Sequence, residues 1–404
     1  MNTKKNILFV MPNLKTGGIT SAFLNLLDEL RNSKLKIDVL CFDSDDVNLL
    51  PSYVNILPSN KFLRILTVNQ MVINKESKIL GLFRLFCGAI TNLLGQGLVY
   101  KILMLSYRKT KKYDVAISFS QTANNSLFGG CNEFVLQRSV ASEKISFLHC
   151  DYQKSGLDTP YSKKIYNQFD KIAAVSDGVK NLFIKCRPEL KNKVFTVYNC
   201  HQFESIKNLS QKGSIKYQSD VLNFVTVARL SKEKGHERML SVFKKLKDAG
   251  YNFCWHIIGG GTQDFVNDFT YKINEYKLSE NVVMHGKQDN PYKYMLNADV
   301  LLVPSFHEAA PMVYSEALCL CIPIVSTNTL SADEFITKNS FGLVCDNNEC
   351  SLFSSVKSII DNPLLLDKYK TAIKSLFDTT NNTALNQFYK LLGSEFYEWY
   401  GHNS

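Results

Sequence analysis

The sequence of 404 residues lacks several patterns that mark common classes of protein. Its 11 cysteines include no CxxC pair, so the spacing typical of zinc sites and dithiol redox sites is missing. The dinucleotide fingerprint GxGxxG is also missing, because residues 259–264 read GGGTQD. There is no short-period repeat and no low-complexity segment, and a composition of 45% hydrophobic and 21% charged residues indicates neither disorder nor a fibrous repeat. What remains is a globular chain whose cysteines we expect to be buried thiols in a reducing compartment.

The length and the first residues bear on size and location. A chain of 404 residues is long enough for two or three domains, each with its own core. Residues 1–12 contain two lysines and then only about six apolar residues, too few for the hydrophobic segment of a signal peptide. We therefore expect a cytoplasmic location.

The positive charge of the chain is concentrated in one region. Residues 61–112 hold ten lysines and arginines and one acidic residue, Glu76, so this region carries +9 of the net charge of +10. It also contains large apolar side chains that recur every three or four residues and predict one face of a helix: Ile79, Leu82, Phe83, Phe86, Ile90, Leu93 and Leu94. The apolar stretch is shorter than the roughly twenty residues of a membrane span.

Two interpretations of region 61–112 stay open. Each basic residue near an anionic membrane contributes roughly 1 kcal/mol to binding, and an apolar helix face adds to this, so we expect the region to lie on an anionic membrane surface. The alternative is a helix that faces the core, with solvated basic residues beside it. No nucleic-acid partner is expected, because no recognised binding module accompanies the charge.

Short β-branched runs alternate with segments of helical period along most of the chain. The pattern predicts strands near residues 6–10, 37–42, 115–119, 145–149, 171–175, 194–198, 222–228, 253–258, 282–285, 300–303, 324–326 and 342–345. Residues 201–220 lose the pattern and predict a linker. The fold class is therefore α/β, with two Rossmann-like, doubly wound domains at 1–200 and 221–383 that face each other across a cleft. An aromatic-rich helix in 384–404 is expected to return to the first domain.

The most informative segment follows the strand predicted at 300–303. Glu308 comes shortly after this strand, and Glu316 follows eight residues later, within a predicted helix. The backbone N–H groups of Met312 and Val313 would lie at the helix N-terminus, where unpaired amides and the helix dipole favour a phosphate. A carboxylate inside the helix suits a ribose diol, and one in front of it suits sugar hydroxyls. The alternative is a pair of solvated glutamates on an ordinary helix.

Two loops of the second predicted domain offer partners for a diphosphate. Arg229 follows the first strand of this domain and Lys234 lies in the same loop, so both cations can converge on one diphosphate. Gly259 and Gly260 follow the next strand, where missing side chains let a ligand approach the backbone. The alternative is a basic loop that is simply solvated.

The first predicted domain contributes three further candidates. Gly17 and Gly18 occupy its first strand-to-helix turn, where a phosphate can approach, although a tight turn would also need glycine. His149 ends a strand, the position where reactive groups gather in parallel sheets, but a single histidine is often structural. Asp43 and Asp45 form a DxD pair on a polar loop, at which we expect no metal.

Together these motifs resemble the retaining GT-B glycosyltransferases of family 4, a likeness carried by Gly17, Gly18, Arg229, Lys234, Gly259, Glu308 and Glu316. The resemblance covers nearly the whole chain and is strongest over residues 222–327. It implies a metal-independent hexosyltransferase that uses a nucleotide diphosphate sugar, needs no other cofactor and retains the anomeric configuration. It further implies that Arg229 and Lys234 stabilise the departing diphosphate, that Glu308 and His149 lie at the donor sugar, and that Glu316 binds the ribose.

The resulting hypothesis is a peripheral enzyme on the inner face of the cell membrane. Its acceptor would be a lipid-linked saccharide in the synthesis of a capsule, O-antigen or exopolysaccharide. Two alternatives come from other classes: a nucleotide-sugar-binding protein without turnover, and an NAD-dependent oxidoreductase. The first would not need both Glu308 and Lys234, and the second would need the missing fingerprint.

Overall fold

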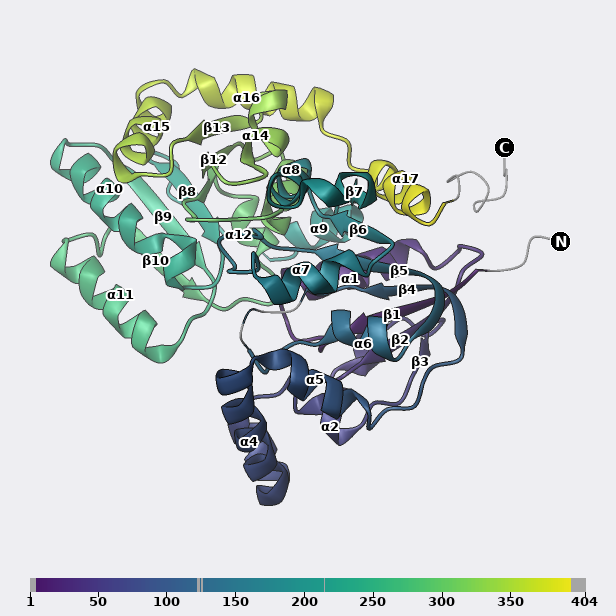
Figure 1. Ribbon diagram of the computed structural model, residues 1–404. Helices are drawn as coiled ribbons and strands as arrows, with labels where there is room; N and C mark the ends of the chain where they lie inside the picture. The colour runs from purple at the N-terminus through teal and green to yellow at the C-terminus, as the bar shows by residue number, and fades with distance from the viewer. Residues whose placement is uncertain (1–4, 122–123, 125, 214, 394–404) are drawn as a thin grey trace, which may run out of the picture. The chain divides into compact units, whose positions relative to one another are not determined.

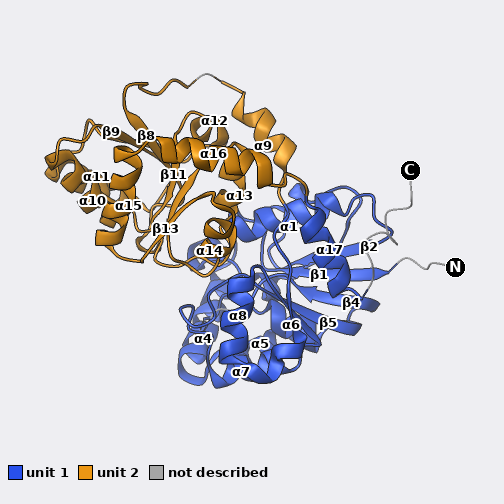
Figure 2. Ribbon diagram, turned by 90° about the horizontal axis from the view of Figure 1, so that it is seen from above, with its two compact units in different colours: residues 1–200, 381–404 blue, residues 201–380 orange. Residues whose placement is uncertain are grey.

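The computed structural model describes residues 5–121, 124, 126–213 and 215–393. The chain divides into two compact units: unit 1 comprises residues 1–200 and 381–404, and unit 2 comprises residues 201–380 (Figure 2). Each unit is built on one parallel sheet with helices on both faces (Figure 1). The predicted α/β class is confirmed.

The sheet of unit 1 has seven strands in the order β3-β2-β1-β4-β5-β6-β7. Its strands are β1 (Asn6–Met11), β2 (Lys36–Cys41), β3 (Asn55–Ile56), β4 (Lys112–Ser118), β5 (Val140–Leu148), β6 (Lys171–Ala174) and β7 (Val194–Thr196). After Asn6, the central strand β1 is an unbroken apolar run that is buried on both faces, as expected where helices cover both sides of a parallel sheet. Its Ile7 pairs with Ile37 of β2 and with Val115 of β4.

The helices of unit 1 fall into a covering layer and an added group between β3 and β4. The covering helices are α1 (Gly18–Glu29), α6 (Cys131–Gln137), α7 (Pro160–Asn167), α8 (Asp177–Cys186) and α17 (Asn382–Leu391), and the short helices η1 (Val47–Leu49) and η2 (Pro188–Lys193) lie in loops. The added group is α2 (Lys61–Arg64), α3 (Gln70–Glu76), α4 (Lys78–Leu94) and α5 (Gln96–Met104). Helix α4 projects away from the sheet (Figure 1).

The sheet of unit 2 has six strands in the order β10-β9-β8-β11-β12-β13. They are β8 (Leu222–Val227), β9 (Phe253–Ile258), β10 (Val282–Gly286), β11 (Val300–Val303), β12 (Ile324–Thr327) and β13 (Gly342–Cys345). The helices are α9 (Phe203–Ser210), α10 (His236–Asp248), α11 (Gln263–Glu275), α12 (Tyr292–Met295), α13 (Met312–Cys319), α14 (Ala332–Phe335), α15 (Glu349–Asp361) and α16 (Leu364–Leu376), with the short helices η3 (Lys232–Lys234) and η4 (Thr337–Asn339).

Two segments near the unit boundaries show that the chain is not divided into a first unit, a linker and a second unit in simple sequence order. Residues 201–220 were expected to be a linker, but they contain α9, whose Phe203 and Ile206 belong to a hydrophobic core of unit 2. Helix α17 belongs to unit 1, where Phe388 stacks on Phe9 with ring centres 6.3 Å apart. The rest of the predicted C-terminal helix, residues 394–404, lies outside the described residues.

In both sheets the strand order reverses direction at one point. The reversal lies between β1 and β4 in unit 1 and between β8 and β11 in unit 2. Loops that leave the carboxyl ends of such neighbouring strands run to opposite faces and leave a crevice, where open α/β sheets bind their ligands.

Candidate functional site

The loops after β8 and β11 meet at the reversal point of unit 2. The Nζ atom of Lys234 lies 2.7 Å from Oε1 of Glu308, and the Oγ of Ser305 donates to the same oxygen at 2.7 Å. The backbone N–H of Phe306 also donates to the carbonyl of Glu233, at 2.9 Å. The structure thus brings two of the predicted residues into direct contact although 74 positions separate them.

A buried arginine holds the loop that carries Glu308. Arg238 on α10 donates from Nε to the carbonyl of Pro304 at 2.8 Å and from Nη1 to Oδ1 of Asn347 at 2.6 Å. Its guanidinium carbon lies 4.1 Å from the ring centre of Phe306, and Asn347 in turn donates to the Phe306 carbonyl at 2.9 Å. Burial lowers the pKa of Arg238. The sequence pattern did not single out Arg238, although a basic residue directly before the apolar run of α10 is a usable signal.

Glycines fix the approach of the neighbouring loops. Gly259 has φ +154°, and a Cβ there would lie 1.8 Å from the carbonyl oxygen of Ala228. The N–H of Leu230 donates to the carbonyl of Gly260 at 2.9 Å, so the glycine turn lies directly against the loop that carries Arg229. Close packing of these two loops is therefore sufficient to require glycine at 259. At Gly260 the nearest atom to a Cβ would be 3.4 Å away, which leaves that position comparatively open.

Arg229 is held much more loosely than Lys234. Its side chain is 78% exposed, and its Nη2 lies 3.5 Å from Oε1 of Glu233. An ion pair this exposed contributes little to stability, so the guanidinium remains able to change partners. Arg229 is therefore adjacent to the pair formed by Lys234 and Glu308 along the chain, but the described contacts do not join it to that pair.

Helix α13 begins at Met312 and places Glu316 in its second turn. Pro311 precedes the helix, and no side-chain hydrogen bond caps its N-terminus, so the first amides, those of Met312 and Val313, have no side-chain acceptor. Tyr292 donates a hydrogen bond to the Glu316 carboxylate. Burial is the larger effect and raises the pKa of Glu316 to about 7. A partly desolvated carboxylate of this kind favours the approach of hydroxyl donors.

In unit 1 the predicted turn and histidine lie at strand ends. Gly17 and Gly18 are exposed at the start of α1, which has no side-chain cap, and a Cβ at Gly17 would meet nothing closer than 4.0 Å. His149 follows β5, and its ring lies against Phe119 and Phe147. Burial lowers the pKa of His149 to about 3, so the imidazole is neutral at physiological pH and is unsuited to act as a cationic acid.

A cavity of about 270 Å³ opens at the reversal point of unit 1. It lies at the ends of β1, β4 and β5, and its lining includes Pro12, Gln121 and Cys150. The side chain of Gln121 accepts a hydrogen bond from the backbone N–H of His149 at 3.2 Å. The lining mixes polar and apolar groups, which suits a hydroxylated ligand.

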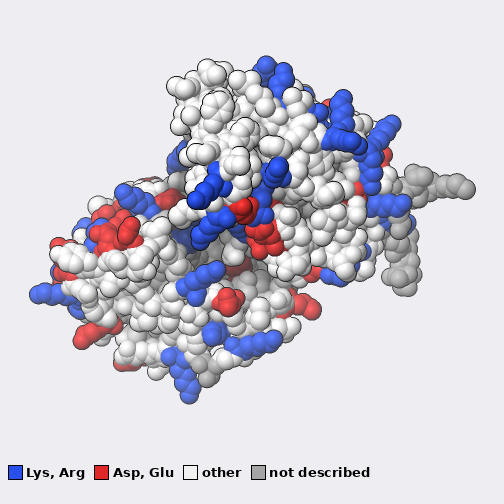
Figure 3. Space-filling model, turned by 90° about the horizontal axis from the view of Figure 1, so that it is seen from below, with Lys and Arg blue, Asp and Glu red and all other residues white. Residues whose placement is uncertain are grey.

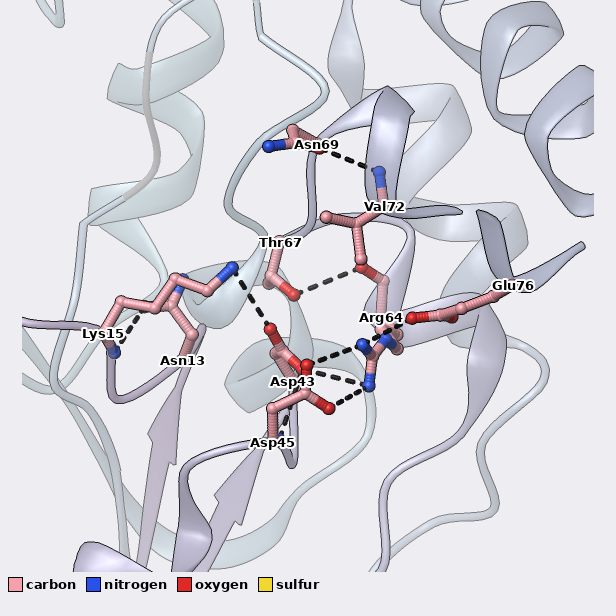
Figure 4. Close-up of polar contacts among 9 residues, drawn as sticks. All are labelled: Asn13, Lys15, Asp43, Asp45, Arg64, Thr67, Asn69, Val72 and Glu76. Carbon is pink, nitrogen blue, oxygen red and sulfur yellow. Dashed lines mark hydrogen bonds and ion pairs between the residues drawn. The ribbon is translucent and has the colours of Figure 1, made fainter. Parts of the chain in front are cut away.

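The DxD pair is occupied by cations of the protein itself (Figure 4). Arg64 on α2 lies 2.5 Å from Asp45, 3.2 Å from Asp43 and 2.7 Å from Glu76, and Lys15 lies 3.4 Å from Asp43. The hydrogen bond from Arg64 lowers the pKa of Asp45. Within the described ranges, no group of three or more histidine, cysteine or acidic residues has the arrangement of a metal site.

Comparison with known families matches residues 209–375 to the family described as glycosyl transferases group 1. A capsular polysaccharide biosynthesis glycosyltransferase, CapM of Staphylococcus aureus, is 24% identical over 61% of this chain and 67% of its own length. An N-acetylgalactosamine-N,N'-diacetylbacillosaminyl-diphospho-undecaprenol 4-alpha-N-acetylgalactosaminyltransferase of Campylobacter jejuni is 27% identical over 55% of this chain and 56% of its own length. The chain spans about half the length of the first curated relatives it matches, 41%, 52% and 56%.

Solved structures extend the likeness to the whole chain. Anabaena HepE in complex with UDP and glucose aligns over 96% of this chain and 100% of its own, with a TM-score of 0.67 and 15% identity. TarM aligns over 97% of this chain and 99% of its own, with a TM-score of 0.66 and 14% identity. These neighbours show the same two-unit fold, while the family match covers most of unit 2. The chain therefore has the GT-B architecture, and its residues 209–375 match the family described as glycosyl transferases group 1.

Proposed function

We propose that this protein transfers a hexose-type sugar from a nucleotide diphosphate sugar, with retention of the anomeric configuration and without a metal. The observation that carries the proposal is the contact between Lys234 and Glu308, which shortly precedes the uncapped helix α13 in the chain. When the glycosidic bond of the donor breaks, its electron pair moves to the diphosphate oxygen. Fixed cations and helix amides stabilise this growing negative charge more in the transition state than before it.

Each predicted residue then has a distinct task in the donor site. Lys234 bridges the Glu308 carboxylate and the diphosphate, while the exposed Arg229 turns toward the same phosphates. The amides of Met312 and Val313 donate to phosphate oxygens. These tasks need no metal ion, because lysine, arginine and amide groups supply the positive charge.

The carboxylates and the remaining backbone groups bind the sugar and the nucleoside of the donor. Glu316 accepts from the ribose diol, and Glu308 faces the sugar hydroxyls. Gly260 provides an open backbone position for the nucleotide. In unit 1, the amides after Gly17 and Gly18 and the neutral imidazole of His149 are hydrogen-bonding groups suited to sugar hydroxyls.

The proposed acceptor is a lipid-linked saccharide of a capsule, O-antigen or exopolysaccharide. The Campylobacter jejuni relative carries diphospho-undecaprenol in its name, and the Staphylococcus aureus relative is named for capsular polysaccharide biosynthesis. The cavity beside His149 suits a saccharide end. A cytoplasmic enzyme, peripheral on the inner face of the membrane through its basic region 61–112, would meet such an acceptor directly.

Donor binding and turnover can be tested separately. A thermal-shift screen with uridine, guanosine and adenosine diphosphate sugars should reveal one stabilising donor, because ligand at 100 times its dissociation constant stabilises a protein by about 2.7 kcal/mol. Release of the nucleotide diphosphate with a lipid-linked saccharide, unchanged by EDTA, should follow, and NMR of the product should show the donor's anomeric configuration. Binding without release in any acceptor mixture would leave a nucleotide-sugar-binding protein, and no binding would remove the proposal.

A further inference from the structure

Helix α4 carries its large apolar side chains on the side that faces solvent. Ile79 is 82% exposed, Leu82 68%, Phe86 62% and Leu93 82%. These positions follow one another by three, four and seven residues, so they form one stripe along the helix. Phe83 and Ile90 are half-buried. The alternative interpretation of this region, an apolar helix that faces the core, is therefore wrong for most of the stripe.

The inner side of α4 has the composition usually found outside. Its buried positions are Gly81, Cys87 and Thr91, and a Cβ at Gly81 would lie 1.9 Å from a side-chain oxygen of Asn74. Arg84 also turns inward and donates to the carbonyl of Ile65 at 3.3 Å. A helix that packs small and polar residues inward and large apolar residues outward is reversed relative to the helices of water-soluble domains.

The apolar surface continues beyond this stripe. The neighbouring exposed side chains are Met71 on α3, Leu85 and Leu94 on α4, Leu98 and Ile102 on α5, and Leu105 just after α5. Figure 3 looks from the side on which α4 lies in Figure 1 and shows a protruding surface without charged side chains, with blue side chains beside it. A continuous apolar surface of this kind on a folded protein marks an interaction site.

The charges around this surface identify its partner. Lys75, Lys78 and Lys101 are exposed on the same three helices, and Arg108 follows them. The one acidic residue of region 61–112, Glu76, is paired with Arg64 at 2.7 Å (Figure 4). Apolar side chains flanked by cations match the acyl region and the anionic headgroups of a bilayer. A protein partner does not present a layer of phosphate groups beside an apolar region.

The dimensions fit a helix that lies in the bilayer interface. With 17 residues, α4 is about 25 Å long, and the described residues include no helix that is both long and apolar enough to cross a membrane. Its apolar face is broad enough to enter the acyl boundary while the lysines stay at headgroup level.

We propose that α4, together with the adjoining exposed side chains of α3 and α5, inserts flat into the interface of an anionic lipid membrane. The role of this membrane contact, which is to bring the enzyme to a lipid-linked acceptor, rests on the proposed function. The membrane contact itself does not. It also narrows the expected contact from the whole basic region to one apolar surface with a few cations beside it.

Flotation of the full chain with phosphatidylglycerol-containing vesicles tests the surface. The wild type should float with these vesicles and much less with phosphatidylcholine alone. The double variant L82E/F86E should lower the partition coefficient by about a hundredfold, since two large apolar side chains are lost from the buried face. A matched control is Leu364→Glu, which changes an apolar side chain 74% exposed on α16 of unit 2 and should float like the wild type.

A fluorescent reporter gives the depth of insertion and an independent check. Phe86→Trp should show a blue-shifted emission with anionic vesicles and quenching by lipids brominated on their acyl chains. The proposal would be overturned if L82E/F86E floated as well as the wild type, or if vesicles left the emission of Phe86→Trp unchanged. So would lipid-free self-association that L82E/F86E abolishes, because the surface would then bind a second copy.

The outcome for the surface can be separated from the outcome for the enzyme. Thermal stabilisation by a donor sugar needs no membrane, so L82E/F86E should keep it in full, which also shows that the variant is folded. If L82E/F86E no longer floats but still binds the donor, the membrane-binding surface is supported. If the wild type floats but does not bind a donor, the result counts against the proposed function alone.

Discussion

Replacement of Glu316 by glutamine should stabilise the folded protein and at the same time weaken donor binding. Burial raises the pKa of this carboxyl from 4.5 to about 7, so the folded state favours its neutral form. Between these two pH values the folded chain keeps a proton that the unfolded chain has released, and stability therefore falls as the pH rises. The rise in pKa corresponds to about 3 kcal/mol, all of it lost above pH 7.

Glutamine has no such pH dependence. We expect E316Q to gain up to about 3 kcal/mol over the wild type at pH 8 and nothing at pH 4.5. Urea denaturation at both pH values measures the difference. Glu280→Gln, on the exposed surface of the same unit, is the matched control and should change stability by less than about 0.5 kcal/mol at either pH.

Donor binding should change in the opposite direction. If the ionised carboxylate accepts from the ribose diol, wild-type affinity for the donor found in the thermal-shift screen falls by up to about tenfold for each pH unit below 7, because protonation competes with binding. A nucleotide diphosphate sugar is a suitable ligand because its diphosphate diester does not titrate in this range. E316Q should bind more weakly at pH 8 and with little pH dependence. Equal stability of both proteins at pH 8, or a wild-type affinity that is flat from pH 5 to 8, would refute the reasoning.

The other predictions concern the loops around the site and the buried histidines. Lys234→Ala and Glu308→Ala should each lower kcat for nucleotide release by about 10²–10³-fold, and the double variant should lose much less than the product, because the two side chains contact each other. Arg238→Met should lower kcat and leave the thermal shift by donor nearly intact, since Arg238 acts on the loop of Glu308; an unchanged kcat would remove this role. Gly259→Ala should lower the urea midpoint by an amount equivalent to about 2–4 kcal/mol, because its Cβ meets a carbonyl, whereas Gly88→Ala, with nothing within 4 Å, should be tolerated. Acid should destabilise the fold between pH 6.5 and about 4. In this range burial keeps four histidines of the folded state neutral, whereas the same histidines of the unfolded chain bind protons: His149, His201, His236 and His256. A calorimetric melting temperature that is flat over this range would contradict their burial.

The regular part of the fold could be read from the sequence because its signal is local. All twelve predicted strands are present, since each is a short apolar run followed by a turn and a helical pattern. Strand β3 was not predicted, because its two exposed residues, Asn55 and Ile56, form no apolar run and depend on pairing with β2. Helix α9 was not predicted either, because its sequence is mostly polar and its buried apolar side chains are Phe203 and Ile206.

The site was accessible from the sequence only where strand ends determine the geometry. Lys234 and Glu308 follow strands that are neighbours in the sheet, so their contact could be expected from topology alone. Arg238 and Tyr292 act through contacts with distant loops. The basic residue directly before the apolar run of α10 is a usable signal for Arg238, but the sequence around Tyr292 gives no such signal. The direction in which α4 faces is also a tertiary property: a period of three to four residues predicts an apolar stripe but not the side on which it meets a partner.

The return of α17 to unit 1 sets the order in which this protein can fold. Phe388 stacks on Phe9, and Lys171 donates to the carbonyl of Leu391, so strand β1 and helix α17 share one core. Synthesis on the ribosome delivers all of unit 2 before α17 emerges. Unit 2 can therefore reach its native state during translation, while unit 1 waits for α17 with part of its aromatic core uncovered. For the cell, exposure of unit 1 to aggregation and proteolysis lasts until unit 2 has been made and α17 has emerged.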